Sequence, residues 1–206
     1  MITQRVFETW FKKLADVYTE NKEYLTELDS AIGDADHGIN MARGFSAVKE
    51  SLATPPSGVS SLFKQVSMTL IKTVGGASGP LYGTFFMKSA ASLPQESEIS
   101  LEALAQALHV GFDGLKKMGK SVVGEKTMVD AWTPALVALD EAIKKKSADK
   151  NAIRAAADGA EAGMKATIPM LATKGRASYL GERSIGHQDP GATSTWLMLK
   201  TLAEVL

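Results

Sequence analysis

Cysteine is missing from all 206 residues of the sequence. Its absence excludes a disulfide framework, a zinc site built on thiolates and a cysteine nucleophile, and it agrees with a reducing compartment. The first residues resemble no signal peptide, and no apolar run approaches the roughly 20 residues that cross a bilayer. We therefore expect a cytoplasmic protein with no membrane partner.

An excess of charge of either sign is also missing. The 23 lysine and arginine residues balance 23 aspartate and glutamate residues, so the formal net charge is zero. Such a chain has no overall field that would attract nucleic acid or an anionic membrane, and we expect neither as a partner. Any chemistry that depends on charge has to be local.

Strand signals are scarce as well, since no two alternating runs are joined by a hairpin turn. Apolar residues instead recur at steps of three and four, as in Val6, Trp10, Leu14 and Val17. This period predicts amphipathic helices around a shared core, hence an all-α fold in which residues 1–206 form a single domain. Breaks rich in glycine, proline or serine separate about eight helices, at 3–28, 37–52, 58–73, 79–92, 100–117, 127–146, 148–172 and 190–205.

The first break between helices is unusually acidic. Asp29, Asp34 and Asp36 place three carboxylates within eight residues, beside glycines. Mg²⁺ binds a few carboxylates together with phosphate oxygens, and clustered carboxylates repel one another unless a cation compensates. The sequence therefore favours a divalent cation site, although the spacing is not that of an EF-hand. The alternative is that Asp34 or Asp36 caps the next helix in an ordinary surface loop.

A second break, at residues 75–80, is rich in glycine. Glycines let main-chain amides approach a ligand closely, and Ser78 could cap the helix that follows, with Pro80 in its first turn. The start of such a helix attracts an anion such as phosphate. The segment is not a Walker loop, because no Gly-Lys-Ser or Gly-Lys-Thr follows. A close helix crossing that needs small residues is the alternative.

A third break, at 174–194, is long for a compact domain and therefore indicates a functional loop. Arg176 and Arg183 are candidate cations for phosphate oxygens, or surface ion pairs. Asp189 is expected to cap the last helix, with Pro190 at its first position.

Further candidates are single residues in these breaks and in a fourth one, which begins at 119–124. Thr127 is expected to cap a helix, and Met128 could pack on a nucleobase. His37 and His187 lie in two of the suspect loops, where either could contact phosphate or orient an aspartate. No nucleophile-elbow pattern supports a serine–histidine–aspartate triad.

Four separated motifs, in order over nearly the whole chain, resemble the nucleotide-binding L family of dihydroxyacetone kinases. The motifs are Gly33-Asp34-Ala35-Asp36-His37-Gly38, Gly75-Gly76-Ala77-Ser78-Gly79-Pro80, Gly175-Arg176-Ala177-Ser178-Tyr179-Leu180-Gly181-Glu182-Arg183 and His187-Gln188-Asp189-Pro190-Gly191-Ala192.

This resemblance implies a closed barrel of eight antiparallel helices with a nucleotide in the loops at one end. It implies that Asp29, Asp34 and Asp36 hold two Mg²⁺ ions and that Arg176 is catalytic. The residues implied to bind ADP or ATP are His37, Gly38, Ile39, Asn40, Ser78, Gly79, Gly119, Thr127, Met128, Arg176, Asp189, Pro190 and Gly191.

The resemblance also implies a reaction. The length of the chain is similar to that of the ADP-binding subunit of the bacterial phosphotransferase-dependent enzyme rather than the fused ATP-dependent kinase. Bound ADP would be recharged to ATP by a phosphohistidine-carrying M subunit of the phosphotransferase system. The γ-phosphoryl would then pass to dihydroxyacetone held on a K subunit, giving dihydroxyacetone phosphate. A homodimer is expected, and the base that activates the substrate hydroxyl is not expected here.

Three other interpretations remain open on the sequence. The chain could be an L-type domain serving another acceptor, as in a fatty-acid kinase, a nucleotide-binding regulator without transfer activity, or a helical scaffold whose loops are only turns.

Overall fold

A computed structural model describes residues 1–206 and has the expected all-α fold. None of its helices combines the length and the apolar character that crossing a membrane requires. Two short strands, β1 (Ile2–Thr3) and β2 (Glu98–Ile99), pair antiparallel. The helices are α1 (Gln4–Glu20), α2 (Lys22–Ile32), α3 (His37–Ser51), α4 (Val59–Thr73), α5 (Ser78–Ser92), α6 (Leu101–Gly119), α7 (Met128–Lys144), α8 (Asp149–Ala166) and α9 (Pro190–Val205), with a 3₁₀ segment η1 (Arg176–Ser184).

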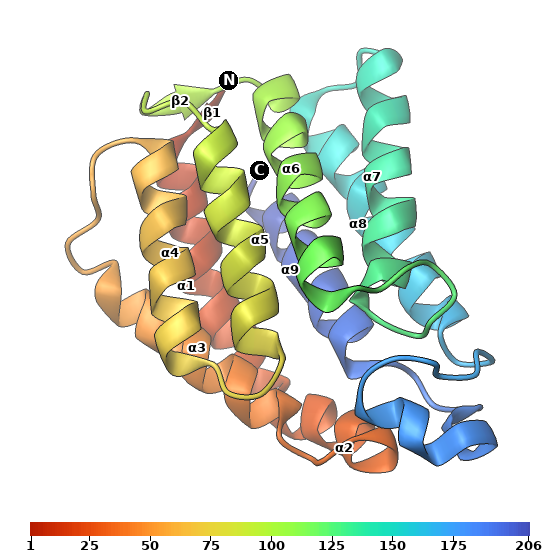
Figure 1. Ribbon diagram of the computed structural model, residues 1–206. Helices are drawn as coiled ribbons and strands as arrows, with labels where there is room; N and C mark the ends of the chain where they lie inside the picture. Colours follow the sequence, from red (N-terminus) through yellow and green to blue (C-terminus); the bar gives the residue numbers. More distant parts are fainter.

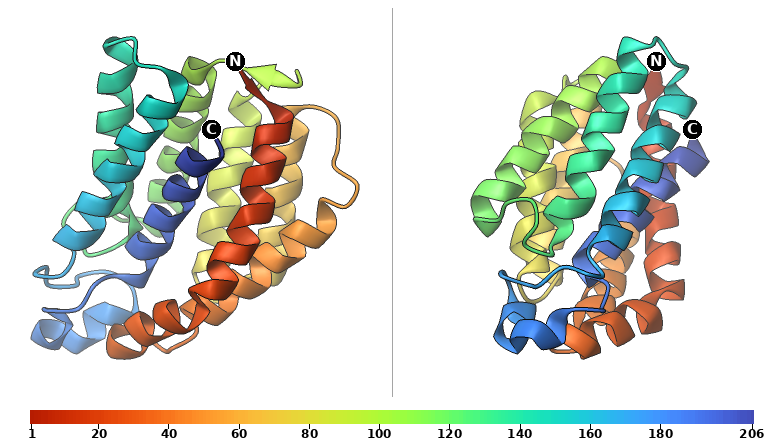
Figure 2. Two further views of the ribbon diagram at one scale, coloured as in Figure 1. Left: turned by 180° about the vertical axis from the view of Figure 1, so that it is seen from behind. Right: turned by 90° about the vertical axis from the view of Figure 1, so that its right-hand side faces the viewer.

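Eight of the helices form a closed ring, which is the barrel that the resemblance implied. Neighbours pack in the order α1, α3, α4, α5, α6, α7, α8, α9, and α9 returns to α1. Their directions alternate around the ring (Figures 1 and 2). The remaining helix, α2, lies across one end of the barrel (Figure 1).

The sequence wrongly predicted one continuous helix over 3–28. The Asn21 side-chain Nδ2 donates to the Val17 carbonyl at 2.8 Å, and α1 ends at Glu20. Asparagine favours helix ends because its short side chain bonds to the nearby main chain. The interruption lets α2 turn across the barrel end and carry Asp29 there. The predicted helix 148–172 likewise ends early, at Ala166.

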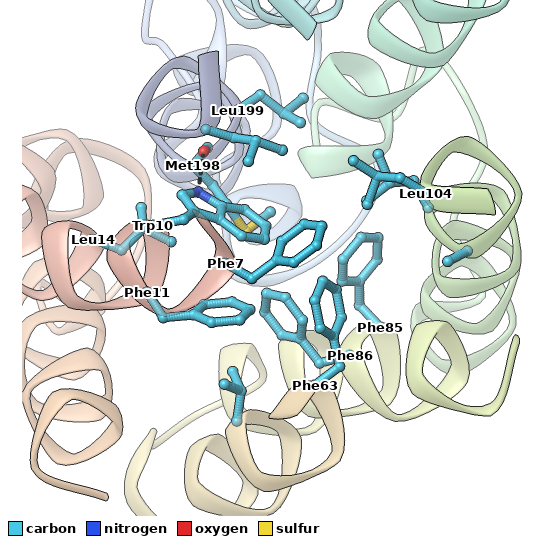
Figure 3. Close-up of a cluster of buried hydrophobic side chains, with 14 of the residues drawn as sticks. Phe7, Trp10, Phe11, Leu14, Phe63, Phe85, Phe86, Leu104, Met198 and Leu199 are labelled. Carbon is cyan, nitrogen blue, oxygen red and sulfur yellow. Dashed lines mark hydrogen bonds between the residues drawn. The ribbon is translucent and has the colours of Figure 1, made fainter. Parts of the chain in front are cut away.

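The barrel interior is filled by a cluster of 48 buried residues, with aromatic rings prominent among them. Figure 3 shows Phe7, Trp10 and Phe11 of α1 pointing inward toward phenylalanines of α4 and α5. The Trp10 indole donates to the Met198 carbonyl of α9 at 2.9 Å, which helps to close the ring. Burying one such side chain stabilises the fold by about 1.5–3 kcal/mol. The packed core therefore fixes the helices, and with them the helix ends that position the site.

The connections between helices divide into two groups. Four of them, at 33–36, 74–77, 120–127 and 167–189, lie at the lower end in Figure 1 together with α2, and we call this the site end. The connections at 52–58, 93–100 and 145–148 lie at the opposite end with β1, β2 and the chain N-terminus, and we call this the far end. All breaks that the sequence singled out for chemistry are at the site end.

Candidate functional site

The three aspartates of the first break converge. Carboxylate oxygens of Asp29, Asp34 and Asp36 all lie within 4.8 Å of one another. Asp29 is buried in the last turn of α2, whereas Asp34 is exposed in the loop and Asp36 is half-buried. Between the last two, Ala35 has a φ of 61°, a left-handed conformation that costs a non-glycine residue about 1–2 kcal/mol. The backbone is thus bent at the point where the two carboxylates are brought together.

The capping alternative for this loop is wrong. Asp36 stands at the N-cap position of α3 but makes no capping hydrogen bond with its side chain. Asp29 reaches over from α2 instead, and its Oδ2 accepts the main-chain N–H of Asp36 at 2.8 Å and of His37 at 3.1 Å. A Cβ on Gly33 would lie 2.0 Å from the other oxygen, Oδ1, so glycine is needed there. The cap comes from Asp29, and Asp36 keeps its oxygens free for a cation.

Arg176, at the start of η1, lies against this cluster. Its Nε is 3.0 Å from Asp34 Oδ2, in an ion pair open to solvent. Together with the aspartates it lines a cavity of about 170 Å³. The other polar or charged residues that line this cavity are His37, Ser78, Lys126, Thr127, Lys174 and Asp189.

A second cavity, of about 350 Å³, adjoins the first. It lies between the site-end parts of α5, α6 and α7, and its wall is largely apolar. The two cavities share His37, Ala77, Ser78, Thr127, Lys174, Gly175 and Asp189, while Leu81, Leu115, Met118, Gly119, Met128, Val129 and Gly191 line only the second. An apolar slot that opens onto charged groups suits a ligand with one flat apolar part and one polar, anionic part.

Ser78 does not cap α5 as expected. The N-cap position belongs to Ala77, and Ser78 Oγ lies 3.1 Å from Nδ1 of His37. Pro80 does fall in the first turn of the helix. Ala77 and Ser78 line both cavities, so the start of α5, with its unpaired N–H groups, lies where the cavities meet.

His37 is buried, and both of its ring nitrogens have partners. Nε2 lies 2.9 Å from Ser194 Oγ, and Nδ1 contacts Ser78. Burial lowers the pKa of His37, and the charges of Asp29 and Asp36 oppose that shift only in part. A neutral imidazole with both nitrogens engaged holds α3, α5 and α9 together beneath the cavities, rather than serving as a free acceptor of a phosphoryl group.

Asp189 caps α9 as expected. Its carboxylate accepts the Ala192 N–H at 2.7 Å, and Pro190 is the first residue of the helix. Burial raises the pKa of Asp189 to about 7, and the Ala192 hydrogen bond opposes this rise. Thr127 caps α7 in the same way, in a capping box with Asp130. Both capping residues line both cavities.

Several predicted binding residues line neither cavity. Ile39 is 47% exposed on the outer face of α3. Gly38 serves packing, since a Cβ there would lie 2.0 Å from the Lys22 carbonyl oxygen. Gly79 is similar, with the Val74 oxygen 2.3 Å from its Cβ position.

Asn40 also lies outside the cavities. Its Oδ1 accepts from Arg43 Nη2 at 2.6 Å, next to Gly75. The side chains of Arg183 and His187 are exposed and line neither cavity. The structure therefore brings together the carboxylates, Ser78, Thr127, Met128 and Arg176 around the two cavities. The predicted residues that line neither cavity lie outside this group.

Sequence reasoning missed two lysines and the leucines of the apolar wall. Lys174 lines both cavities, and its position two residues before Arg176 could have indicated this role. Lys126 is buried and donates to main-chain carbonyls of residues far away in the sequence, so no local signal indicated it. Leu81 and Leu115 are indistinguishable in the sequence from ordinary core positions.

Comparison with known proteins gives a consistent result. A family model described as the DAK2 domain matches residues 31–204. The "PEP-dependent dihydroxyacetone kinase, ADP-binding subunit DhaL" of Escherichia coli (strain K12) is 47% identical over 195 residues, covering 94% of this chain and 93% of that protein. The "PTS-dependent dihydroxyacetone kinase, ADP-binding subunit DhaL" of Lactococcus lactis is 45% identical over 209 residues, covering 100% of both.

A solved structure has the same fold. It is the dihydroxyacetone kinase from C. freundii in complex with AMP-PNP and Mg²⁺, which matches with a TM-score of 0.73 at 28% identity. The match covers 98% of this chain and 33% of the solved chain, so this chain spans about a third of that kinase.

Proposed function

The chain belongs to the DAK2 domain family, and from that premise we propose that it is the ADP-binding subunit of a phosphotransferase-dependent dihydroxyacetone kinase. The observation that carries the proposal is the joined pair of cavities, in which an apolar slot of about 350 Å³ opens onto three carboxylates whose oxygens lie within 4.8 Å. This arrangement fits a nucleobase at one end and a metal-bound polyphosphate at the other. Residues 1–206 would act as one nucleotide-binding domain.

We assign the slot to the adenine and ribose. Met128 and Gly119 line it, and Gly191 borders it with its Cβ position 3.4 Å from Met128 Cε. The polyphosphate is assigned to the region where the cavities meet, beside the amide-rich start of α5 and next to Ser78. Helix starts of this kind attract anions.

The chemistry of the donor set fits Mg²⁺. Three carboxylates provide the oxygen ligands that this ion prefers, and their mutual repulsion requires a cation. We propose that Asp29, Asp34 and Asp36 hold two such ions. When bound, they would neutralise charge on the phosphates.

Arg176 is assigned the catalytic role. An ion pair exposed to solvent contributes at most about 1 kcal/mol, so the guanidinium can leave Asp34 for a phosphate oxygen. Phosphoryl transfer depends mainly on positioning and charge neutralisation, and Arg176 supplies both from the rim of the acidic cavity. No residue of this chain is assigned as the base for the substrate hydroxyl.

The acceptor and the donor come from partner subunits in this proposal. A K subunit would present dihydroxyacetone, and a phosphohistidine-carrying M subunit would recharge ADP to ATP in the cytoplasm. Exposed apolar side chains on the two loops around the cavities support docking of a protein there: Val122, Val123, Tyr179 and Ile185. The implied homodimer belongs to the same proposal and can be tested by light scattering.

The proposal is tested by reconstitution. The purified chain is denatured and the released nucleotide is identified by mass, and the native chain is then combined with the phosphotransferase proteins, phosphoenolpyruvate and a K subunit loaded with dihydroxyacetone. We expect released ADP and formation of dihydroxyacetone phosphate that depends on this chain. Formation of product at the same rate without this chain, or no nucleotide at all, would contradict the proposal.

A further inference from the structure

Lys126 is a buried cation that the proposed reaction does not yet use. Only 1% of its surface is exposed, although lysine is almost never buried without a partner. Its Nζ lies 2.6 Å from the carbonyl oxygen of Thr167, 3.2 Å from that of Met170 and 3.3 Å from that of Ile168, and it also contacts that of His187, so its three N–H groups are shared among four acceptors. Four main-chain oxygens thus surround one ammonium group.

These carbonyls belong to the two ends of a single loop. The segment 167–189 leaves α8 at Thr167 and enters α9 after Asp189, and Lys126 contacts it at 167–170 and at 187. The two ends also touch directly, because the Gly186 N–H donates to the Ile168 oxygen at 2.8 Å and the Asp189 N–H donates to Thr167 Oγ1 at 3.0 Å. The ammonium therefore closes the neck of the loop that carries Arg176.

The backbone around Lys126 is itself fixed. Lys126 has a φ of 62°, in the left-handed region, which a non-glycine residue seldom adopts. On either side of it, the Asp130 carboxylate accepts the N–H of Gly124 at 2.6 Å and of Thr127 at 2.9 Å. The next residue, Thr127, lines both cavities. Lys126 thus joins the connection beside the apolar slot to the loop that carries the arginine.

We propose that Lys126 is a positioning residue for phosphoryl transfer, which holds the neck of the loop 167–189 closed so that Arg176 stays at the acidic cavity. This inference rests on the proposed function. Hydrogen bonds from a charged donor are strong. The Thr167 and Ile168 oxygens also accept main-chain N–H groups, but removing the ammonium leaves the Met170 and His187 oxygens without this donor, which costs free energy. Loss of the ammonium is therefore expected to open this loop while the barrel remains folded.

The first test compares two substitutions in the ligand-free protein. Lys126→Met keeps an unbranched side chain but removes the charge, and Lys120→Met is the matched control, since Lys120 is exposed, lies in the same connection and has a φ of 48°. We expect Lys126→Met to speed amide hydrogen exchange across 167–189 by about 10- to 100-fold, and to leave α1 and α5 protected. Lys120→Met should leave exchange unchanged everywhere.

A second test separates the charge from the volume of the side chain. Because the sequence has no cysteine, a Lys126→Cys variant can be alkylated at one position in denaturant and refolded. Aminoethylation restores an ammonium at nearly the length of lysine, and propylation gives a neutral side chain of similar length. We expect the aminoethyl form, and not the propyl form, to regain slow exchange in 167–189, slow release of Mg²⁺–ADP and the turnover of the reconstituted kinase.

Three results would overturn the inference. These are unchanged exchange in 167–189 for Lys126→Met, equal recovery by both alkyl groups, or loss of protection in α1 and α5 together with the loop, which would make Lys126 a residue of the fold alone. Failure of the proposed function is a different result. In that case exchange would respond as expected, but the unaltered chain would support no phosphoryl transfer.

Discussion

The two ends of the barrel are built differently. At the far end, main-chain groups and neutral side chains hold the connections, as where the Gln4 N–H donates to the Ser97 oxygen and the Gln4 side chain accepts the Gly58 N–H. At the site end, buried charged side chains take part as well. The buried aspartate, histidine and lysine side chains all lie there, namely Asp29, His37, Lys126, Asp130 and Asp189. The far end has no buried charge. The site end concentrates buried charge, which is costly and is typical of a functional site.

The largest effect is expected from Asp36→Ala, which should disrupt ligand binding at the site end and leave the far end intact. Asp36→Ala removes a carboxylate that makes no capping bond, so the fold should persist while bound nucleotide is lost. A ligand at 1,000 times its Kd stabilises the folded state by about 4 kcal/mol, and the variant should lose that gain with Mg²⁺–ADP. Nucleotide content and thermal unfolding with and without Mg²⁺–ADP measure both effects.

The control for this substitution is Glu96→Ala, an exposed carboxylate at the far end. It should keep nucleotide and the full ligand-dependent rise in melting temperature. Retention of nucleotide by Asp36→Ala would remove Asp36 from the metal site.

The next largest expected effect is the dependence of the free energy of unfolding on pH, which arises from buried Asp189 at the site end. Burial raises the pKa of Asp189 from 3.8 to about 7 in the folded chain. Between these values the folded state binds more protons than the unfolded state, so the free energy of unfolding falls as pH rises from 4 to 7. The contribution of this group is at most about 4 kcal/mol across that window, at 1.36 kcal/mol for each unit of pKa shift.

Asp189→Asn should remove this slope, since an amide does not titrate. Denaturant unfolding of the ligand-free protein at several pH values gives the difference between the two chains. A difference that stays constant from pH 4 to 7 would contradict the raised pKa of Asp189.

A pair of glycine substitutions compares the two ends directly. Gly58, at the far end, has a φ of 90°, and a Cβ there would lie 2.1 Å from the Gln95 oxygen. Gly58→Ala should destabilise the fold by about 2 kcal/mol, as strained backbone positions do, and keep nucleotide binding. Gly33→Ala should instead displace the Asp29 carboxylate and weaken binding of Mg²⁺–ADP. Urea unfolding and titration calorimetry of both variants give the comparison, and weaker binding in Gly58→Ala alone would reverse the assignment of the ends.

The smallest expected effect is the difference in stability between two substitutions of Asp29. This difference separates its capping of α3 from its binding of a cation. Asp29→Asn keeps an oxygen for the N–H groups of Asp36 and His37, whereas Asp29→Ala removes the cap and should cost about 1 kcal/mol more in the ligand-free protein. Both variants lose the charge and should bind Mg²⁺ less tightly. Equal unfolding free energies of the two ligand-free variants would show that Asp29 does not cap α3.

Much of the fold could be predicted from the sequence because helical periodicity and glycine or proline breaks are local signals. The helix expected at 58–73 is α4 at Val59–Thr73, and the Asp189-Pro190 start of α9 was foreseen from capping chemistry alone. The interruption at Asn21 was missed because an asparagine within an amphipathic pattern does not by itself end a helix.

The residues of the candidate site also divide into those with a local sequence signal and those without one. The acidic cluster was visible because its three carboxylates are close in sequence. Lys126 was not, since its acceptors lie 41 to 61 residues away. Only the family resemblance implied Ile39 at the site, and helical geometry turns it to the outside, where it is 47% exposed. Leu81 and Leu115 line the slot but carry the same apolar signal as the core.

The measurement that bears most directly on the central claim is anomalous diffraction from crystals grown with Mn²⁺ and ADP, because manganese can replace magnesium and gives a distinct signal. The account predicts two manganese peaks at about 2.0–2.6 Å from carboxylate oxygens of Asp29, Asp34 and Asp36, with the diphosphate beside the start of α5 and the adenine between α6 and α7. Manganese and diphosphate bound elsewhere, with those three carboxylates turned apart, would contradict it.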